Sequence, residues 1–229
     1  MVERGESTSG ASAATALVFA GGDPVPAHRA PDMPGAGMVI AADSGTEHAL
    51  ALGYAVDLVV GDLDSVAPDA LARATDGGAT VEQHPAVKDQ TDLELALRAA
   101  VAHGATRVIV VGGAGGRLDH LLANALVLAS PRFAHVAVEW FTGARARAAV
   151  ARPDVAVRVA GEPGDACSLL ALGGPADGVR TDGLVYPLGG ETLHPGSTRG
   201  ISNQLMTTEA TVTIGHGALL VVQPDPDGA

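Results

Sequence analysis

Short apolar runs that alternate with helical segments most constrain the fold of this chain. Up to about Trp140, each apolar run is long enough for one strand, and the segments between the runs place apolar residues at helical spacing. The predicted strands cover residues 16–19, 38–42, 58–60, 80–83 and 107–111. Helices are predicted over residues 46–52, from Pro68, after Thr91 and over residues 118–129. Strands that alternate with helices indicate a mostly parallel α/β/α domain of the Rossmann-like type.

The helix predicted after Thr91 has the clearest start and stop signals. Thr91 and Glu94 have the spacing of a capping box, and Gly104 is a suitable C-terminal stop. The apolar stripe of this helix is formed by Leu93, Leu97 and Val101. Asp92 is therefore expected in the first turn, where the positive end of the helix dipole favours a carboxylate or a phosphate.

The pattern changes after about residue 143, where helical spacing disappears. Short β-like runs separated by Gly and Pro occupy residues 155–159, 168–172, 211–214 and 219–222. Such runs are typical of a small β-sandwich or barrel. The predicted organisation is an α/β domain over residues 15–143 and a β-sandwich domain over 144–224. Residues 1–14 are predicted to be a disordered tail and residues 225–229 a frayed end.

Composition excludes several classes of function. The net charge of −12, from 26 acidic and 14 basic residues, disfavours a nucleic-acid partner, because phosphate backbones bind Lys- and Arg-rich surfaces. Cys167 is the only cysteine, so the chain has no internal disulfide, and a buried apolar role for its thiol is expected. No apolar run is long enough to span a membrane, and the N-terminal segment does not resemble a signal peptide. We therefore expect a cytoplasmic protein without a membrane partner.

Four aspartates lie at the predicted ends of strands and starts of helices. Asp62 and Asp64 follow the apolar run 58–60, and Asp89 and Asp92 stand where a helix should begin. Ligands of parallel sheets bind beyond the carboxyl ends of the strands. Two carboxylates roughly 4 Å apart repel each other by about 4 kcal/mol at an effective dielectric constant near 20. Mg²⁺ would remove this repulsion and binds carboxylates together with phosphates. The pattern predicts a phosphate–Mg²⁺ site, with solvated turn aspartates as the alternative.

A different enzyme class also fits the first pair. Residues 62–66 match the DxDxV motif of haloacid-dehalogenase-like phosphatases, in which Asp62 would be the nucleophile that forms an aspartyl phosphate. Gly61 separates Asp62 from the strand, and the later Lys and acidic motifs of that family do not follow in order. A non-catalytic protein that binds a nucleotide or another small molecule is a further alternative.

A glycine cluster at residues 112–116 follows the predicted strand 107–111. It matches neither a P-loop nor the GxGxxG pattern, so alone it indicates only a flexible loop. Arg117, Asp119 and His120 come directly after it. The loop amides can bind phosphate oxygens, Arg117 can donate to one, and Asp119 can orient Arg117 or a ribose. His120 is either a ligand contact or a hydrogen-bonding residue within the fold.

Taken together, these segments resemble the thiamine pyrophosphokinase family. The resemblance is carried by residues 43–45, 61–65, 88–92, 112–120 and 200–203. A spaced pattern adds to it, formed by Thr181, Gly183, Leu184, Tyr186, Leu188 and Ser197. The resemblance implies an ATP- and Mg²⁺-binding catalytic domain and a thiamine-binding sandwich. It also implies a homodimer with thiamine between two subunits, and a reaction that converts ATP and thiamine to AMP and thiamine diphosphate.

The resemblance also implies roles for individual residues. Three aspartates would be catalytic and hold Mg²⁺ with the assistance of Asp89: Asp62, Asp64 and Asp92. The residues that would bind ATP are Asp43, Ser44, Gly45, Lys88, Gly115, Gly116, Arg117, Asp119 and His120. Ser202 and Asn203 would hydrogen-bond the aminopyrimidine ring of thiamine. Gln204 departs from the family pattern, in which Glu is common, so a charge is absent beside the expected thiamine site.

Overall fold

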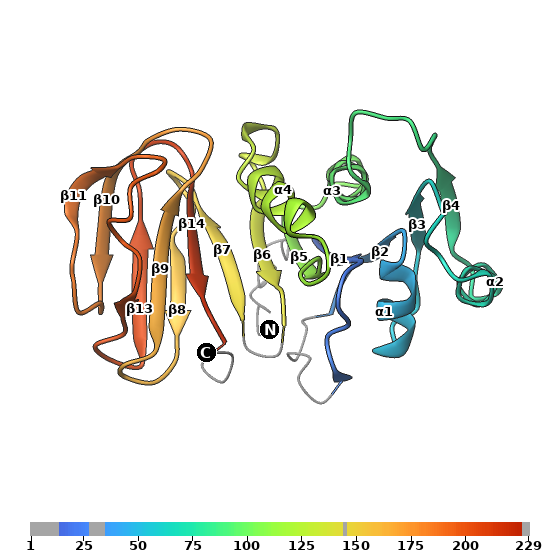
Figure 1. Ribbon diagram of the computed structural model, residues 1–229, viewed down its shortest axis with the longest axis horizontal. Helices are drawn as coiled ribbons and strands as arrows, with labels where there is room; N and C mark the ends of the chain where they lie inside the picture. The colour runs from blue at the N-terminus through green and yellow to red at the C-terminus, as the bar shows by residue number, and fades with distance from the viewer. Residues whose placement is uncertain (1–13, 28–34, 144–145, 226–229) are drawn as a thin grey trace, which may run out of the picture.

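The structure is a computed structural model that describes residues 14–27, 35–143 and 146–225. One ten-stranded sheet runs through the molecule, and its strand order is β12-β9-β14-β7-β6-β5-β1-β2-β3-β4 (Figure 1). The strands from β6 to β4 pair in parallel. They are β1 (Thr15–Ala20), β2 (Met38–Ala42), β3 (Leu58–Gly61), β4 (Thr80–Gln83), β5 (Arg107–Gly112) and β6 (Ala137–Phe141).

Helices cover both faces of this parallel part. They are α1 (Gly45–Ala51), α2 (Pro68–Asp76), α3 (Asp92–Ala102) and α4 (Leu118–Leu128). Alternate residues of β1 belong to different core clusters: Ala16 and Val18 pack with α3 and the end of α4, whereas Leu17 and Phe19 pack with α1 and α2. Figure 1 accordingly shows α3 and α4 on one side of the sheet and α1 on the other. The predicted α/β/α arrangement is confirmed.

The sheet continues into the C-terminal half through an antiparallel pair. β7 (Arg147–Ala151) pairs with β6, and the sheet extends through β14 (Leu219–Gln223) and β9 (Ala166–Ala171) to β12 (Asn203–Gln204). A second sheet has the order β11-β10-β13-β8. Its strands are β8 (Val157–Ala160), β10 (Ala176–Asp182), β11 (Gly189–Leu193) and β13 (Glu209–Thr213).

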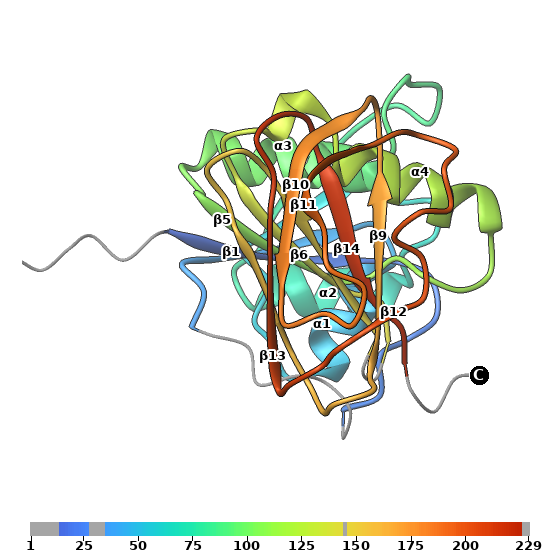
Figure 2. The same cartoon turned by 90° about the vertical axis from the view of Figure 1, so that its left-hand side faces the viewer.

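The two sheets enclose a separate apolar core, as expected for a β-sandwich. Leu169 and Val221 of the long sheet share this core with Val179 and Val212 of the second sheet. Figure 2 looks onto this end of the molecule, where β10 and β13 lie beside β9 and β14. The predicted C-terminal β-sandwich is therefore confirmed as a fold.

The predicted strands and helices of the α/β half correspond to β1–β5 and α1–α4. Sequence analysis did not predict β6 and β7, which join the halves. The predicted boundary between residues 143 and 144 lies in the connection between these paired strands, and it stays a prediction because the two halves share one sheet. Almost all of the predicted tails, 1–14 and 225–229, lie outside the described residues.

Cys167 of β9 is fully buried in the sandwich core, and this burial raises the pKa of its thiol to about 11. At pH 8 only about a thousandth of the thiol would be ionised, and the thiolate is the reactive form. We expect the native protein to resist thiol reagents at pH 8 and to react rapidly once unfolded in guanidinium. The measurement is the rate of reaction with a chromogenic disulfide. Equal rates in the folded and unfolded protein would contradict the buried position.

Candidate active site

Three carboxylates converge at one edge of the parallel sheet. Asp43 follows β2, Asp62 follows the neighbouring strand β3, and Asp92 is the first residue of α3. One carboxylate oxygen from each lies within 4.8 Å of the others. The clustering follows from the topology, because the carboxyl ends of adjacent parallel strands meet at the same edge.

Local backbone geometry makes room for this cluster. Gly61 has φ +150°, and a Cβ atom at this position would lie 3.1 Å from Asp92 Oδ1 and 3.2 Å from Asp43 Cβ. Asp43 itself has a positive φ of +50°, and its amide donates to the Val60 carbonyl at 3.0 Å. The start of α3 is capped as predicted, since Thr91 Oγ1 accepts from the Glu94 amide at 3.3 Å.

The cluster concentrates negative charge that its surroundings neutralise only in part. Burial raises the pKa of Asp43; the Ser65 hydroxyl donates to its carboxylate and opposes the rise, while Asp92 and Asp62 add to it. Lys88 Nζ lies 2.8 Å from Asp62 Oδ2 and 3.1 Å from Asp92 Oδ1. Its hydrogen bond lowers the pKa of Asp62. Burial lowers the pKa of Lys88, but the bonds to Asp62 and Asp92 outweigh this effect and the pKa is raised.

The donor atoms of the cluster fit a hard divalent cation. Asp43 Oδ1 is buried and has no hydrogen-bond partner in the described part of the chain, and Asp92 Oδ1, also buried, has only the ion pair with Lys88 Nζ. A buried carboxylate oxygen without a donor is costly, and a cation bound between the two would satisfy both. The nearby Asp64 is exposed, its amide donates to Asp62 Oδ1 at 3.3 Å, and the charge of Asp62 raises its pKa.

Most of the residues predicted to bind ATP line a cavity of about 640 Å³ beside this cluster. The predicted residues that line it are Asp43, Ser44, Asp62, Asp64, Lys88, Asp92, Gly115, Gly116, Arg117 and His120. Three others do not line it: Gly45, Asp89 and Asp119. Asp89 is exposed. Gly45 is required by packing, because a Cβ atom there would lie 2.1 Å from the Phe19 carbonyl oxygen.

Asp119 acts on Arg117 in this structure. Arg117 Nη2 donates to Asp119 Oδ2 at 2.6 Å, and Arg117 Nε donates to Asp119 Oδ1 at 3.2 Å. This pairing lowers the pKa of Asp119 to about 2. Both side chains are exposed at the start of α4, so Asp119 orients the guanidinium beside the cavity.

The carbonyl groups of the glycine loop after β5 accept hydrogen bonds from other parts of the fold. The carbonyl oxygen of Gly112 accepts from Trp140 Nε1 at 2.7 Å, and that of Gly113 accepts from Asn124 Nδ2 at 2.9 Å. The Ala114 carbonyl accepts from the Asp23 amide at 2.7 Å. The amides of residues 114–116 donate to no acceptor within the described ranges. Free consecutive amides of this kind form a binding site for an anion such as phosphate. Asn124 and Trp140 are not predicted from the sequence, because no motif marks them.

The residues predicted to bind thiamine lie in the sandwich. The Ser202 side chain is exposed on a backbone with φ +56°. Asn203 is buried, and its amide group holds the backbone of Tyr186: Oδ1 accepts from the Tyr186 amide at 3.0 Å and Nδ2 donates to its carbonyl at 2.8 Å. The tyrosine residue is 66% exposed. Asn203 therefore fixes a segment that presents an aromatic ring to solvent.

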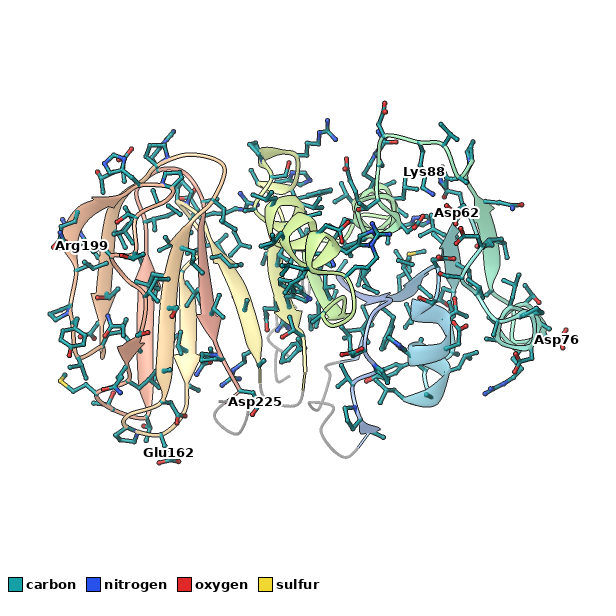
Figure 3. The ribbon with its side chains drawn as sticks, viewed as in Figure 1. Asp62, Asp76, Lys88, Glu162, Arg199 and Asp225 are labelled. Atoms are coloured by element: carbon teal, nitrogen blue, oxygen red, sulfur yellow. The ribbon has the colours of Figure 1, made fainter. Side chains whose placement is uncertain are left out.

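The carboxylate cluster and the residues predicted to bind thiamine lie far apart within one chain. Figure 3 shows Asp62 and Lys88 near one end of the long axis and Arg199, which precedes the Ser202 segment, near the other. Asn203 of β12 and the end of β2 are separated by most of the ten-stranded sheet. At about 4.8 Å per strand, this separation is roughly 30 Å.

Comparison with known proteins places both halves in one family. The model of the thiamin pyrophosphokinase catalytic domain matches residues 33–139, and the model of the thiamin pyrophosphokinase vitamin B1 binding domain matches residues 155–219. The chain belongs to the thiamin pyrophosphokinase family. It is therefore an ATP-dependent kinase. The first match lies in the α/β half and the second in the sandwich.

Individual thiamin pyrophosphokinases agree with this assignment. The protein named thiamine pyrophosphokinase from Bacillus subtilis is 26% identical over 184 residues, which cover 80% of this chain and 86% of that protein. Its crystal structure superposes with a TM-score of 0.77 at 25% identity, and covers 92% of this chain and 98% of that one. The enzyme from Candida albicans, at 13% identity, shares the fold with a TM-score of 0.71 over 92% of this chain and 90% of that one.

The charge of Asp43 should make the folded protein less stable when no cation is bound. We expect Asp43→Asn to raise the melting temperature by a few degrees at pH 8 in EDTA, on the order of 1 kcal/mol. At pH values above the raised pKa of Asp43, the carboxylate is charged in the folded protein and lowers its stability by the full amount. As the pH falls through that pKa, the folded wild type takes up a proton before the unfolded chain does, so the advantage of the variant shrinks.

Thermal unfolding between pH 4 and pH 8 measures this effect. Asp89→Asn is the matched control, because Asp89 is an exposed aspartate outside the cavity and its variant should follow the wild type. An Asp43→Asn variant that is less stable than the wild type over the whole range would contradict the electrostatic account.

Proposed function

We propose that this chain transfers the pyrophosphoryl group of ATP to the hydroxyl group of thiamine, which gives thiamine diphosphate and AMP. One observation supports this most strongly. A carboxylate cluster, in which the buried Asp43 Oδ1 has no donor, and a loop with free amides face one cavity large enough for a nucleotide. The family match over both halves supports ATP and thiamine as the two substrates.

Mg²⁺ is the cation that we propose for the cluster, with Asp43, Asp62 and Asp92 as ligands. Asp64 lines the same cavity and its amide donates to Asp62 Oδ1, so we include it as a further ligand at the exposed edge, whereas Asp89 lies outside the cavity and is left out of this ligand set. When bound, Mg²⁺ would supply positive charge to the β- and γ-phosphate oxygens. Asp43 thus changes from a predicted ATP contact to a proposed metal ligand.

The groups around the cluster have separate proposed roles in binding the phosphates. The free amides of residues 114–116 and the guanidinium of Arg117 donate hydrogen bonds to phosphate oxygens, and Asp119 keeps Arg117 in place. Lys88 holds Asp62 and Asp92 and adds an ammonium charge near the transferred group. These fixed charges and donors match the requirements of phosphoryl transfer, in which positioning and charge neutralisation dominate.

In the transfer step, the thiamine hydroxyl oxygen bonds to the β-phosphorus of ATP. The bond from that phosphorus to the oxygen shared with the α-phosphate breaks, and AMP leaves with both electrons of the bond. Asp92 is the proposed group that orients the hydroxyl and takes its proton, because it belongs to the carboxylate cluster and lines the cavity.

The product of the reaction tests the proposal directly. With ATP, Mg²⁺ and thiamine, the protein should form AMP and thiamine diphosphate, and it should form no AMP when thiamine is omitted. Asp92→Asn should lower kcat by about 10²- to 10⁴-fold while the fold survives, since it removes a metal ligand and a proton acceptor. Chromatography of the nucleotides with mass detection measures both results.

Asp89→Asn is the control for this experiment and should retain near-wild-type turnover, because its carboxylate lies outside the cavity. Loss of activity in both variants to the same degree would contradict the proposed ligand set. Release of ADP or free phosphate, or a phosphoryl group trapped on Asp62, would instead support the phosphatase alternative.

A homodimer is part of the proposed function. The roughly 30 Å of sheet between the carboxylate edge and the Ser202 segment is too long for one thiamine molecule to bridge within a chain. Apolar side chains are exposed at both places. One set lies on α4 and consists of Leu118, Leu122 and Leu126; the other lies beside Ser202 and consists of Val185, Tyr186, Ile201 and Met206. Association of two copies would bury both sets and bring a sandwich to the catalytic cavity.

Mixing two inactive variants tests the shared site. Asp92→Asn disables the α/β half, and the double variant Tyr186→Ala/Ser202→Ala disables the sandwich half. If each site combines halves from two subunits, a mixed dimer contains one intact site. After unfolding and refolding together at equal amounts, about a quarter of wild-type activity should return, because half of the dimers are mixed and one of their two sites works.

Each variant refolded alone provides the background for this experiment. No recovery of activity, in a mixture that sedimentation shows to contain dimers, would mean that each site lies within a single subunit. A wild type that sediments as a monomer at assay concentrations while active would overturn the dimer proposal itself.

A cytoplasmic location completes the proposal. In the described part of the chain, no helix has the length and apolar character needed to cross a lipid bilayer. Cys167 is a free buried thiol, which is compatible with a reducing compartment.

A further inference from the structure

Asn124 is a buried polar residue to which neither the sequence motifs nor the family match assigns a role. It lies on α4, one helical turn after His120, so both side chains face the same direction, and both line the nucleotide cavity. Only 7% of the residue is exposed. An amide beside a ligand cavity offers both a donor and an acceptor, and a ligand can use whichever of the two the fold leaves free.

The donor of this amide holds the glycine loop. Asn124 Nδ2 donates to the Gly113 carbonyl oxygen at 2.9 Å. Gly113 has φ +75°, and a Cβ atom at this position would lie 3.0 Å from Asn124 Nδ2, so loop and side chain are closely fitted. Because the carbonyl is bound by Asn124, the loop is held in the conformation that leaves the following amides free.

The acceptor of the same amide is unused. Asn124 Oδ1 has no hydrogen-bond partner within the residues that the structure describes, although the side chain borders the cavity. A carbonyl oxygen repels phosphate oxygens, so a neutral donor is its suitable partner. A nucleotide carries such donors on its nucleoside part, namely the ribose hydroxyl groups and the exocyclic amino group of adenine.

We propose that Asn124 positions the nucleotide from two sides, an inference that rests on the proposed function of this cavity. Its Nδ2 fixes the phosphate-binding loop through Gly113, and its Oδ1 accepts a hydrogen bond from a donor on the nucleoside. One side chain thereby sets the distance between the nucleoside and the phosphate site. It is a specificity-determining residue for the nucleotide and takes no part in the chemistry of transfer.

Binding measurements without thiamine test this role separately from the reaction. The probes are ATP and three analogues that each lack one donor: 2′-deoxy-ATP, 3′-deoxy-ATP and purine riboside triphosphate. The wild type should bind one of them about tenfold more weakly than ATP, the usual effect of one lost hydrogen bond. Asn124→Ala should bind ATP about 10- to 100-fold more weakly and should no longer distinguish ATP from that analogue.

A second variant separates the two contacts of the amide. Asn124→Asp keeps an acceptor but cannot donate to Gly113, so we expect weaker binding of ATP with the discrimination retained. Leu128→Val is the matched control, because Leu128 is fully buried on the same helix and does not line the cavity. This control should lower the melting temperature and leave both affinity and discrimination unchanged.

Two outcomes would overturn the inference. One is unchanged ATP affinity in Asn124→Ala; the other is undiminished discrimination against every analogue in that variant. Failure of the proposed reaction would look different: the wild type would bind ATP with the expected discrimination but form no AMP when thiamine is added. In that case the role of Asn124 in nucleotide binding would stand.

Discussion

The mutual repulsion of Asp43, Asp62 and Asp92 is the constraint on which the rest of the α/β half depends. The carboxylates are held together by backbone at the ends of β2 and β3 and the start of α3, elements that are themselves anchored in two apolar layers. Lys88 provides one positive charge for three negative ones. The apolar layers on both faces of the sheet must therefore stabilise an edge that is electrostatically unfavourable as long as no cation is bound there.

The single long sheet explains why one fold can serve two very different ligands. Its parallel end presents strand termini, where charged ligands bind, and its antiparallel end packs into a sandwich with exposed apolar and aromatic side chains. The same continuity keeps these two ends of the chain apart. Under the proposed mechanism, association of two chains brings them together, and the interface would then also exclude water from the transferred phosphoryl group.

Sequence analysis could predict the α/β half because its strands are buried on both faces and its helices have clear signals. β1, β3 and β5 are continuous apolar runs, and Thr91 and Gly104 mark the limits of α3. β7 was missed because its sequence is rich in Ala, which favours no strand. β10 was missed because register shifts interrupt its pairing and disturb the alternation of apolar and polar residues.

The site was only partly predictable, because proximity along the chain is not proximity in the fold. Asp89 stands three residues before Asp92 and is predicted to assist it, and this role stays a prediction for a residue that precedes the helix and is exposed. Asp43 is nearly twenty residues before Asp62 and is predicted to contact ATP; β2 and β3 are neighbours in the sheet and bring these two carboxylates together. The order of strands in the sheet decides which aspartates lie together, and this order can be inferred only indirectly from a single sequence.

Two buried asparagines hold backbone segments by hydrogen bonds that no pattern of charge or hydropathy in the sequence predicts. Asn124 binds the Gly113 carbonyl beside the phosphate loop, and Asn203 binds both backbone groups of Tyr186 in the sandwich. An amide suits both places because it donates and accepts at once from a short, planar group. An aspartate would place another negative charge in a chain whose net charge is already −12, and it could not donate to either carbonyl. The glycine loop of one half and the Tyr186 segment of the other are therefore both held by neutral side chains, whereas the proposed phosphate contacts are made by charged ones.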